Sequence, residues 1–381
     1  MMMNRGMLFA AAILLGASSA AAIQLPEERT IGRIEAVFEF QGAMPTGVTV
    51  APNGRIFVNF PRWGDDVPFT VGEIRGGRLL AYPDAEVNRA DNAHPARTFI
   101  SVQSVVADAR NRLWVLDTAA PNFGEPVKGG AKLVAVDLAT NRISKTIVFK
   151  PDVALPKTYL NDVRFDLRQG KEGVAYITDS GTGALIVVDL ATGEAWRRLA
   201  NHHSTKADPA FVPIVEGETL MVRPADGPPQ SFAIPADGIA LSADGATLYY
   251  CPLSSRHLFS VPTAYLRDRS VPEEQVGAAV ADLGEKGASD GLEADAEGRV
   301  YASDYEHDGI RRRLPDGTWE TIVHDPRVLW PDTLSVGPGG WLYFTANQLE
   351  RGARFNGGRD LRQKPYTLFR VKIGGSPVAL K

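Results

Sequence analysis

The residues best suited to do chemistry are polar side chains that each stand just before a strand-like apolar run. They recur at six openings along the chain: Thr46, Gln103 with Ser104, Asn161 with Asp162, Asp237, Asp290 and Asp332. Several carboxylates brought together with an amide would repel one another unless a cation neutralised them. Oxygen ligands of this kind suit Ca²⁺, Mg²⁺ or Mn²⁺, or else the ammonium group of an organic amine.

The same residues also have a purely structural explanation. Asp-Gly and Asn-Asp just before a strand are ordinary turn chemistry, in which the carboxylate binds its own backbone. A turn alone would tolerate Asn, Ser or Gly equally well, so an acid that recurs at the same position of several units favours a shared site. The expected ligand-binding residues are Thr46, Gln103, Asn161, Asp162 and Asp332. Candidate catalytic residues are Asp237 and Asp290, and candidate metal ligands are Asn161, Asp237 and Asp290.

Each opening begins a repeat of short strands, and these strands must position the polar residues. In the stretch 159–190, the Asn-Asp pair leads into the alternating run 163–167, and two further runs, 174–178 and 184–190, follow Gly-bearing turns. Alternation with period two between such turns indicates a β-meander. Six units of this kind predict an all-β protein, a six-bladed β-propeller, in which the loops before the innermost strands converge on one end of a central channel.

One strand-like run, residues 33–40, stands outside the repeat. We predict that it pairs with residues 368–373 in the last blade and so closes the ring. Because each blade must bury both faces against its neighbours, residues 33–381 are expected to form a single domain. Only residues 263–268 and 273–281 have the pattern of short helices.

The N-terminus has the layout of a secretory signal peptide. Arg5 precedes an apolar run at residues 7–15, and small residues follow up to Ala22. We expect residues 1–22 to be cleaved and the protein to be extracytoplasmic, in the periplasm or secreted. The apolar run is shorter than the roughly 20 residues that span a bilayer, and no later segment reaches that length, so no membrane association is expected after cleavage. An uncleaved anchor is the alternative.

Composition narrows the choice of partners. The 381 residues are 44% hydrophobic and 23% charged, with a net charge of −4, so a basic surface for nucleic acid is not expected. A small-molecule ligand and a monomeric state are expected instead. Cys251 is the only cysteine, which excludes an intramolecular disulfide, and its apolar surroundings favour a buried small side chain over a nucleophile.

Trp63 is a further candidate for the ligand site. It ends the segment Phe60-Pro61-Arg62-Trp63, directly after an inner strand, and could overhang the mouth. An aromatic ring there would suit a planar ligand or an amine. Core packing between blades is the alternative role.

Long spaced segments resemble the major royal jelly protein and yellow family. They include Phe60-Pro61-Arg62-Trp63, Ala81-Tyr82-Pro83-Asp84, Tyr159-Leu160-Asn161-Asp162, Ala175-Tyr176-Ile177-Thr178-Asp179-Ser180 and Gly238-Ile239-Ala240-Leu241-Ser242. The resemblance covers about residues 33–381 and implies a secreted six-bladed propeller. The family includes yellow proteins linked to pigmentation and dopachrome conversion, salivary members that bind biogenic amines, and royal jelly proteins. The lone Cys251 departs from the disulfide-bearing eukaryotic members. Composition and the predicted signal peptide suit a bacterial member, periplasmic or secreted, and the resemblance is to the L-dopachrome-tautomerase-related, bacterial type.

A weaker similarity links the chain to the calcium-dependent gluconolactonase and regucalcin-like (SMP-30) propellers. Those proteins hold their metal with a first-blade Glu, two Asn and an Asp, and Asn161 and Asp290 match two of these positions. Asp237 stands where an Asn is expected, and Thr46-Gly47 replaces the Glu. Three hypotheses therefore remain: a propeller that binds or transforms an aromatic amine or dopachrome-like molecule, a divalent-metal-dependent lactonase-like hydrolase, and a non-catalytic interaction propeller.

Overall fold

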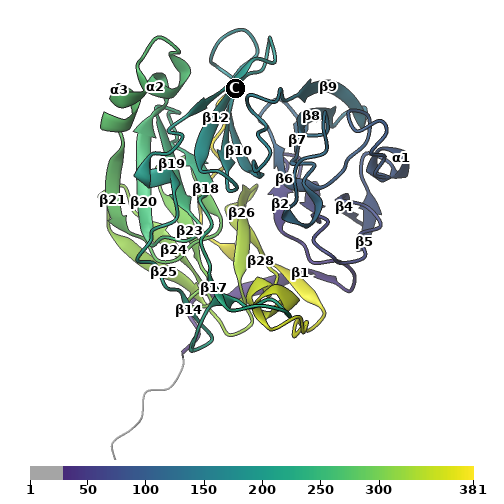
Figure 1. Cartoon of the computed structure of the whole chain (residues 1–381), viewed down its shortest axis with the longest axis vertical. Helices are drawn as coiled ribbons and strands as arrows, with labels where there is room; N and C mark the ends of the chain where they lie inside the picture. Colours follow the sequence, from purple (N-terminus) through teal and green to yellow (C-terminus); the bar gives the residue numbers. More distant parts are fainter. Residues whose placement is uncertain (1–28) are drawn as a thin grey trace, which may run out of the picture.

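In the described part of the chain, six four-stranded antiparallel sheets surround one axis (Figure 1). The structure, a computed structural model, describes residues 29–381. The six-bladed β-propeller predicted from the repeats is therefore confirmed. The predicted signal peptide, residues 1–22, lies outside the described residues and stays a prediction.

The blades follow one another in chain order. Blade 1 contains β2 (Gly47–Val50), β3 (Ile56–Asn59), β4 (Val71–Arg75) and β5 (Arg78–Ala81), and blade 2 contains β6 (Val102–Ala107), β7 (Arg112–Asp117), β8 (Lys132–Asp137) and β9 (Arg142–Val148). Blade 3 contains β10 (Leu160–Asp166), β11 (Val174–Asp179), β12 (Ala184–Asp189) and β13 (Ala195–Arg198), and blade 4 contains β18 (Ala236–Leu241), β19 (Thr247–Pro252), β20 (His257–Pro262) and β21 (Ala281–Glu285). Blade 5 contains β22 (Leu292–Ala294), β23 (Val300–Asp304), β24 (Gly309–Arg313) and β25 (Trp319–His324).

Blade 6 combines the two ends of the described chain. Its strands are β26 (Pro331–Gly337), β27 (Trp341–Ala346), β28 (Tyr366–Lys372) and, outermost, β1 (Ile34–Phe40). β1 runs antiparallel to β28, with Glu35 opposite Arg370, and the two side chains form an ion pair of 2.7 Å. The ring is closed as predicted by the N-terminal strand.

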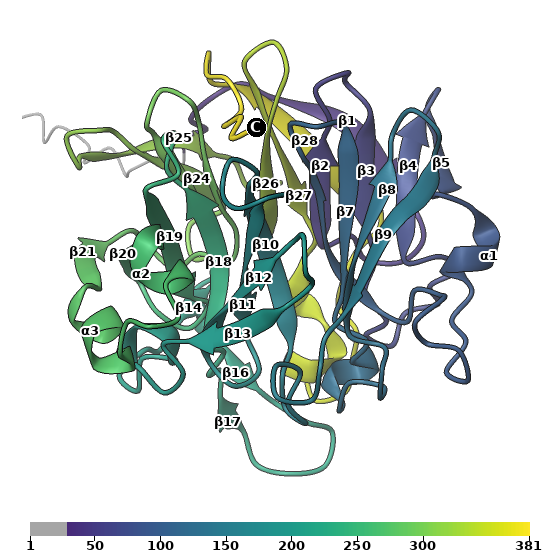
Figure 2. The same ribbon diagram turned by 90° about the horizontal axis from the view of Figure 1, so that it is seen from above.

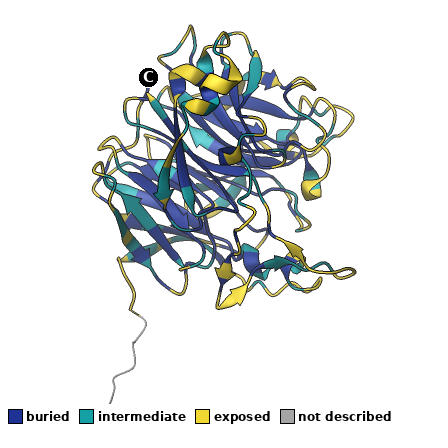
Figure 3. Ribbon diagram, turned by 60° about the vertical axis from the view of Figure 1, so that its left-hand side comes forward, coloured by how far each residue is buried: buried dark blue, intermediate teal, exposed yellow. Residues whose placement is uncertain are grey.

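The core lies between the blades, because alternate residues of each strand face different neighbours. In β7, Trp114 and Leu116 pack with side chains of blade 3, whereas Leu113 and Val115 pack with side chains of blade 1. All four are fully buried. Figure 3 shows the same pattern around the ring, with buried strands in dark blue and exposed loops in yellow. Each apolar side chain buried in this way contributes about 1.5–3 kcal/mol, so the blades stabilise one another.

Helices are few in the described part of the chain. The two predicted segments form α2 (Thr263–Arg267) and α3 (Glu273–Ala278), and a third short helix is α1 (Ala85–Asn88). None of the helices in residues 29–381 is long and apolar enough to cross a membrane.

An insertion between blades 3 and 4 was not predicted. It forms two small ribbons, β14 (Ile214–Val215) with β15 (Glu218–Thr219), and β16 (Met221–Val222) with β17 (Gln230–Ser231). Figure 2 shows β16 and β17 on one face of the ring and the C-terminus on the opposite face.

Candidate functional site

A cavity of about 820 Å³ occupies one end of the ring. Loops from all six blades line it, as expected for the mouth of a propeller channel. Six of the predicted residues lie together in its lining: Trp63, Gln103, Asn161, Asp237, Asp290 and Asp332. Thr46 and Asp162 are buried but are not among the lining residues.

The floor of the cavity is a hydrogen-bonded group of carboxyls. Asp237 and Asp290 share a hydrogen bond. Asp237 also accepts from the Asn161 amide and, at 2.8 Å, from the Ser180 hydroxyl. Asp290 accepts from the indole Nε1 of Trp330 at 2.7 Å. Both carboxyls are therefore fixed in place by donors from neighbouring blades.

Burial decides the protonation of this floor. Desolvation, strengthened by the charge of Asp162, raises the pKa of Asp290 to about 7. Desolvation and the charges of Asp290 and Asp162 raise the pKa of Asp237 well above its usual range. The pKa of Asp332 is raised for the same reasons, although Asn347 donates to its carboxyl at 2.7 Å. The floor therefore keeps protons at pH values where an exposed aspartate has lost its own.

A glycine follows two of the three floor aspartates, Asp237 and Asp290, whereas Thr333 follows Asp332. A Cβ on Gly238 would lie 2.4 Å from the backbone oxygen of Asp290, and one on Gly291 would lie 2.3 Å from that of Asp332. Real Cβ atoms do not approach so closely, so each glycine lets one blade contact the backbone of the next. The two Asp-Gly pairs thus let blade 4 approach blade 5, and blade 5 approach blade 6, at the level of the floor.

We predict that Gly238→Ala destabilises the protein by about 1–3 kcal/mol, because the added methyl group overpacks the contact between blades 4 and 5. Urea unfolding followed by tryptophan fluorescence measures this loss. The matched control is Gly42→Ala, since a Cβ on Gly42 would meet nothing within 4 Å. Equal stability of the two variants would contradict this explanation of the Asp-Gly pairs.

Thr46 and Asp162 have other roles in the structure. The Thr46 hydroxyl accepts from the amide of Asn59 at 2.9 Å, and its carbonyl oxygen accepts from Thr345 at 2.9 Å, so it joins blades 1 and 6. Asp162 is buried, and burial raises its pKa against the opposing effects of Arg164 and Ser104. It acts on the floor through its charge, because it raises the pKa of Asp237, Asp290 and Asp332.

Aromatic side chains form one wall of the cavity. Trp63 stacks on Phe123 with ring centroids 4.6 Å apart, and its Nε1 donates to the hydroxyl of Tyr159 at 2.7 Å. That hydroxyl in turn donates to Gln103 at 3.0 Å. Trp63 therefore faces the cavity while its indole is held by a hydrogen bond, which suits contact with a planar ligand.

Several lining or supporting residues were missed by the sequence analysis. Ser180 and Trp330 hold the floor, and Phe123, Phe232 and Phe355 line the walls. Ser180 directly follows β11, and Trp330 directly precedes β26. Their positions next to strand ends are the sequence feature that could have predicted a place in the site. The three phenylalanines lie in irregular loops that carry no periodicity.

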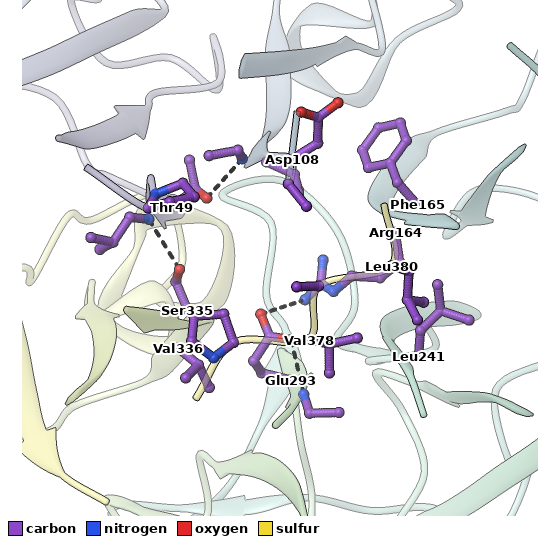
Figure 4. A pocket seen from close by; sticks show the side chains of 18 of the residues that line it. Thr49, Asp108, Arg164, Phe165, Leu241, Glu293, Ser335, Val336, Val378 and Leu380 are labelled. Carbon is purple, nitrogen blue, oxygen red and sulfur yellow. Dashed lines mark hydrogen bonds and ion pairs between the residues drawn. The ribbon is translucent and has the colours of Figure 1, made fainter. Parts of the chain in front are cut away.

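The opposite end of the channel is covered by the C-terminal segment. There Val378 and Leu380 line a much smaller cavity of about 130 Å³, beside an ion pair of 3.7 Å between Arg164 and Glu293 (Figure 4). The Leu167 amide donates to the Leu380 carbonyl at 2.9 Å and holds the segment in place. The large cavity is thus the better candidate for a ligand site.

The floor side chains are arranged to hydrogen-bond one another and not to coordinate a metal ion. Asn161, Asp237 and Asp290 do lie in one cavity, but the Asn161 amide points a donor at Asp237, and the two carboxyls share a hydrogen bond. Within residues 29–381, no group of three or more His, Cys, Asp or Glu side chains is arranged to hold a metal ion. A metal at these residues would have to displace the shared proton and turn the amide.

Cys251 is fully buried, as predicted. Its Sγ lies 3.9 Å from the carbonyl oxygen of Ser289, and burial raises the pKa of the thiol to about 11. The thiolate that a nucleophile requires is therefore disfavoured.

Sequence comparison identifies relatives of the chain. Residues 100–351 match the sequence profile described as Major royal jelly protein. Protein yellow of Drosophila melanogaster is 28% identical over 264 residues, which cover 65% of this chain and 46% of that protein. Protein yellow of Drosophila pseudoobscura pseudoobscura is 28% identical over 281 residues, 69% of this chain and 47% of that protein. The chain spans about half the length of these relatives.

Structure comparison finds other propellers. The calcium-binding protein regucalcin from Agrobacterium tumefaciens has a TM-score of 0.51 at 16% identity and covers 90% of this chain and 97% of its own. A gluconolactonase from Xanthomonas campestris has a TM-score of 0.52 at 13% identity and covers 90% and 89%. A luciferin-regenerating enzyme reaches 0.54 at 13% identity and covers 92% and 99%. At such low identity these likenesses establish the fold alone.

Proposed function

The chain belongs to the major royal jelly protein family, and we propose that it is an exported propeller that binds a planar aromatic molecule in its mouth cavity and moves a proton on it. Dopachrome-like quinones and aromatic amines are the proposed ligand classes. Export rests on the predicted signal peptide, residues 1–22. The single observation that supports proton transfer is the hydrogen-bonded pair Asp237 and Asp290 at the floor of an aromatic-walled cavity.

The size and walls of the cavity support a small aromatic ligand. Its volume of about 820 Å³ lies within the range of roughly 300–1,000 Å³ that is usual for small-molecule sites. Trp63 and Phe123 offer flat apolar surfaces on one side, and Phe232 and Phe355 line the cavity as well. A ring system in contact with these faces would bring its polar edge to the carboxyl floor.

The two carboxyls have complementary states for a tautomerisation. Because the pKa of Asp290 is about 7, this group is substantially ionised near neutral pH and can take a proton from an acidic C–H of the ligand. Asp237, with its raised pKa, is neutral and can give a proton to a carbonyl oxygen of the same ligand. One C–H bond breaks and one O–H bond forms, so the ligand is isomerised without gain or loss of atoms or electrons.

The same floor would attract an amine without catalysis. An ammonium group placed near Asp290 and Asp332 would favour their ionised forms and gain charge-assisted hydrogen bonds. Amine binding is therefore the non-catalytic form of the proposal.

The rival function is metal-dependent hydrolysis of a lactone. The observation in its favour is that Asn161, Asp237 and Asp290 line one cavity. In that case these residues would hold a divalent ion, and the ion would polarise the lactone carbonyl. The hydrogen-bonded arrangement of the same residues favours the proton-transfer proposal.

The test is a thermal-shift and turnover assay on protein treated with a chelator. L-dopachrome and dopamine should each be tried as ligand, gluconolactone as rival substrate, and Ca²⁺ and Mn²⁺ as added ions. We expect stabilisation by an aromatic ligand and conversion of L-dopachrome without added metal. Lactone turnover that needs Ca²⁺ or Mn²⁺ and disappears in Asp290→Ala, with no shift by either aromatic compound, would refute the proposal.

A further inference from the structure

Arg354 stands at the outer end of the aromatic wall. It lines the cavity, and its guanidinium carbon lies 5.0 Å from the ring centroid of Phe123. Phe123 stacks in turn on Trp63, whose indole is held by Tyr159. The cation is thus positioned by a row of aromatic rings that begins beside the carboxyl floor.

The guanidinium of Arg354 has no anionic partner among the described residues. Within residues 29–381 it lies over the rings of Phe123 and Phe355 and makes no hydrogen bond or ion pair. Arg362, which also lines the cavity, differs in this respect, because Asp65 and Asp360 each pair with it at 2.7 Å. An unpaired guanidinium held in a cavity wall is available to an anionic group of a ligand.

A second available cation faces the same cavity. Lys157 is exposed in the lining, and its ammonium group likewise makes no hydrogen bond or ion pair within residues 29–381. Glu125 is the exposed acid nearest in sequence to Phe123, and it also lines the cavity without an ion pair to Arg354. With Arg362 and its two partners Asp65 and Asp360 included, cations and acids balance outside the floor, and Arg354 and Lys157 are the lining cations there without an anionic partner among residues 29–381.

We propose that Arg354, assisted by Lys157, binds a carboxylate of the ligand at the outer end of the cavity. This inference rests on the proposed function and narrows its ligand class. The ligand would be an aromatic acid or zwitterion, such as a ring system with an attached carboxylate, in preference to a simple amine. Its ring would contact Trp63 and Phe123, and its proton-exchanging or cationic edge would reach Asp237 and Asp290.

The polarity of the cavity supports this orientation. A ligand reversed in the cavity would bring its carboxylate beside Asp290, whose ionised form repels it, and would leave Arg354 without a partner. A ligand that lacks the carboxylate avoids the repulsion but gains nothing from Arg354. The reversed ligand and the ligand without a carboxylate both lose the charge-assisted hydrogen bond between carboxylate and Arg354. That bond can be bidentate, because the guanidinium is planar.

The experiment compares two compounds that differ in one carboxylate. Calorimetric titration of the chelator-treated full protein with L-DOPA and with dopamine is expected to give at least tenfold tighter binding of L-DOPA. Arg354→Gln should abolish that preference, and Lys157→Gln should reduce it. The matched control is Arg359→Gln, an exposed arginine of the same loop that does not line the cavity and should keep the preference. Turnover of L-dopachrome and of its methyl ester provides a second readout with the same expected order.

The outcomes separate this inference from the proposed function. If dopamine binds as tightly as L-DOPA, or if Arg354→Gln keeps the preference, the carboxylate subsite is refuted while the aromatic site stands. If neither compound binds the wild-type protein and L-dopachrome is not converted, the proposed function fails and the subsite with it.

Discussion

Replacing Asp290 with Asn is expected to lower the rate of L-dopachrome conversion by about 10²–10⁴-fold, the usual contribution of a general base. The amide cannot take the proton. Its oxygen can still accept the hydrogen bond from Nε1 of Trp330, which lies 2.7 Å from the Asp290 carboxyl in the wild-type protein. The variant should therefore remain folded. In the wild-type protein the rate should rise as pH increases through about 7, because Asp290 must be ionised to act. This rise should be absent from Asp290→Asn.

Although Asp290→Asn should lower the rate, it should make the protein more stable than wild type as the pH rises. The pKa of Asp290 is about 7 in the folded protein and roughly 3.9 in the unfolded chain, so the folded state binds the extra proton between these values. The stabilisation from that proton is complete below the unfolded pKa and is lost as pH rises through the folded one. Relative to wild type, Asp290→Asn should gain on the order of 4 kcal/mol between about pH 4 and pH 7.

Urea unfolding across this pH range, together with the rate assay, tests both effects. The matched control is Asp316→Asn, an exposed aspartate in the turn between β24 and β25, whose loss should change neither the rate nor the shape of the stability profile. A variant that kept more than a tenth of the wild-type rate would remove Asp290 from the proposed role.

Lys132→Met should cause the largest loss of stability, about 3–5 kcal/mol. Lys132 and Asp117 form a fully buried ion pair of 2.6 Å, and the ammonium group also donates to the carbonyls of Pro95 and Gly130. Without the cation, the Asp117 carboxylate is left buried and uncompensated. Urea unfolding at neutral pH measures the loss.

The consequences of this substitution reach the cavity. Asp117 accepts from the backbone amides of Ile100, Ser101 and Ala119, so it fixes the chain just before β6 and the start of the loop that carries Phe123. Lys145→Met is the control, because Lys145 pairs with Glu172 near the surface and should contribute at most about 1 kcal/mol. A similar loss in both variants would contradict the importance of the buried pair.

The sequence predicts the blades well because their physical signals are local. Alternation with period two and glycine-bearing turns mark nearly every inner strand, and the unpaired run at residues 33–40 required a partner, which β28 supplies. The ribbons of residues 214–231 escaped prediction because strands of two residues have no detectable period. The cavity walls escaped it for the same reason, since Phe123 and Arg354 lie in or beside short 3₁₀ turns at η1 (Pro121–Phe123) and η4 (Ala353–Phe355).

The site was predictable at the level of openings, but not of single side chains. Asn161 and Asp162 share one opening, yet only Asn161 lines the cavity, because adjacent strand residues point in different directions and the register of β10 shifts between Leu160 and Val163. Thr46 occupies the same position in blade 1, but its hydroxyl binds Asn59. Such choices depend on contacts between blades that no single repeat contains.

The proposed function depends most on Asp237 and Asp290 forming a proton-sharing pair at the floor of the ligand cavity. Carbon-13 NMR titration of the aspartate carboxyls between pH 4 and pH 9, on wild type and on Asp290→Asn, tests it most directly. We expect one carboxyl that titrates near pH 7 in the wild type and is missing from the variant, together with others that titrate well above the usual aspartate range. Titration of every aspartate below about pH 5, the ordinary range for ionised carboxyls, would contradict it.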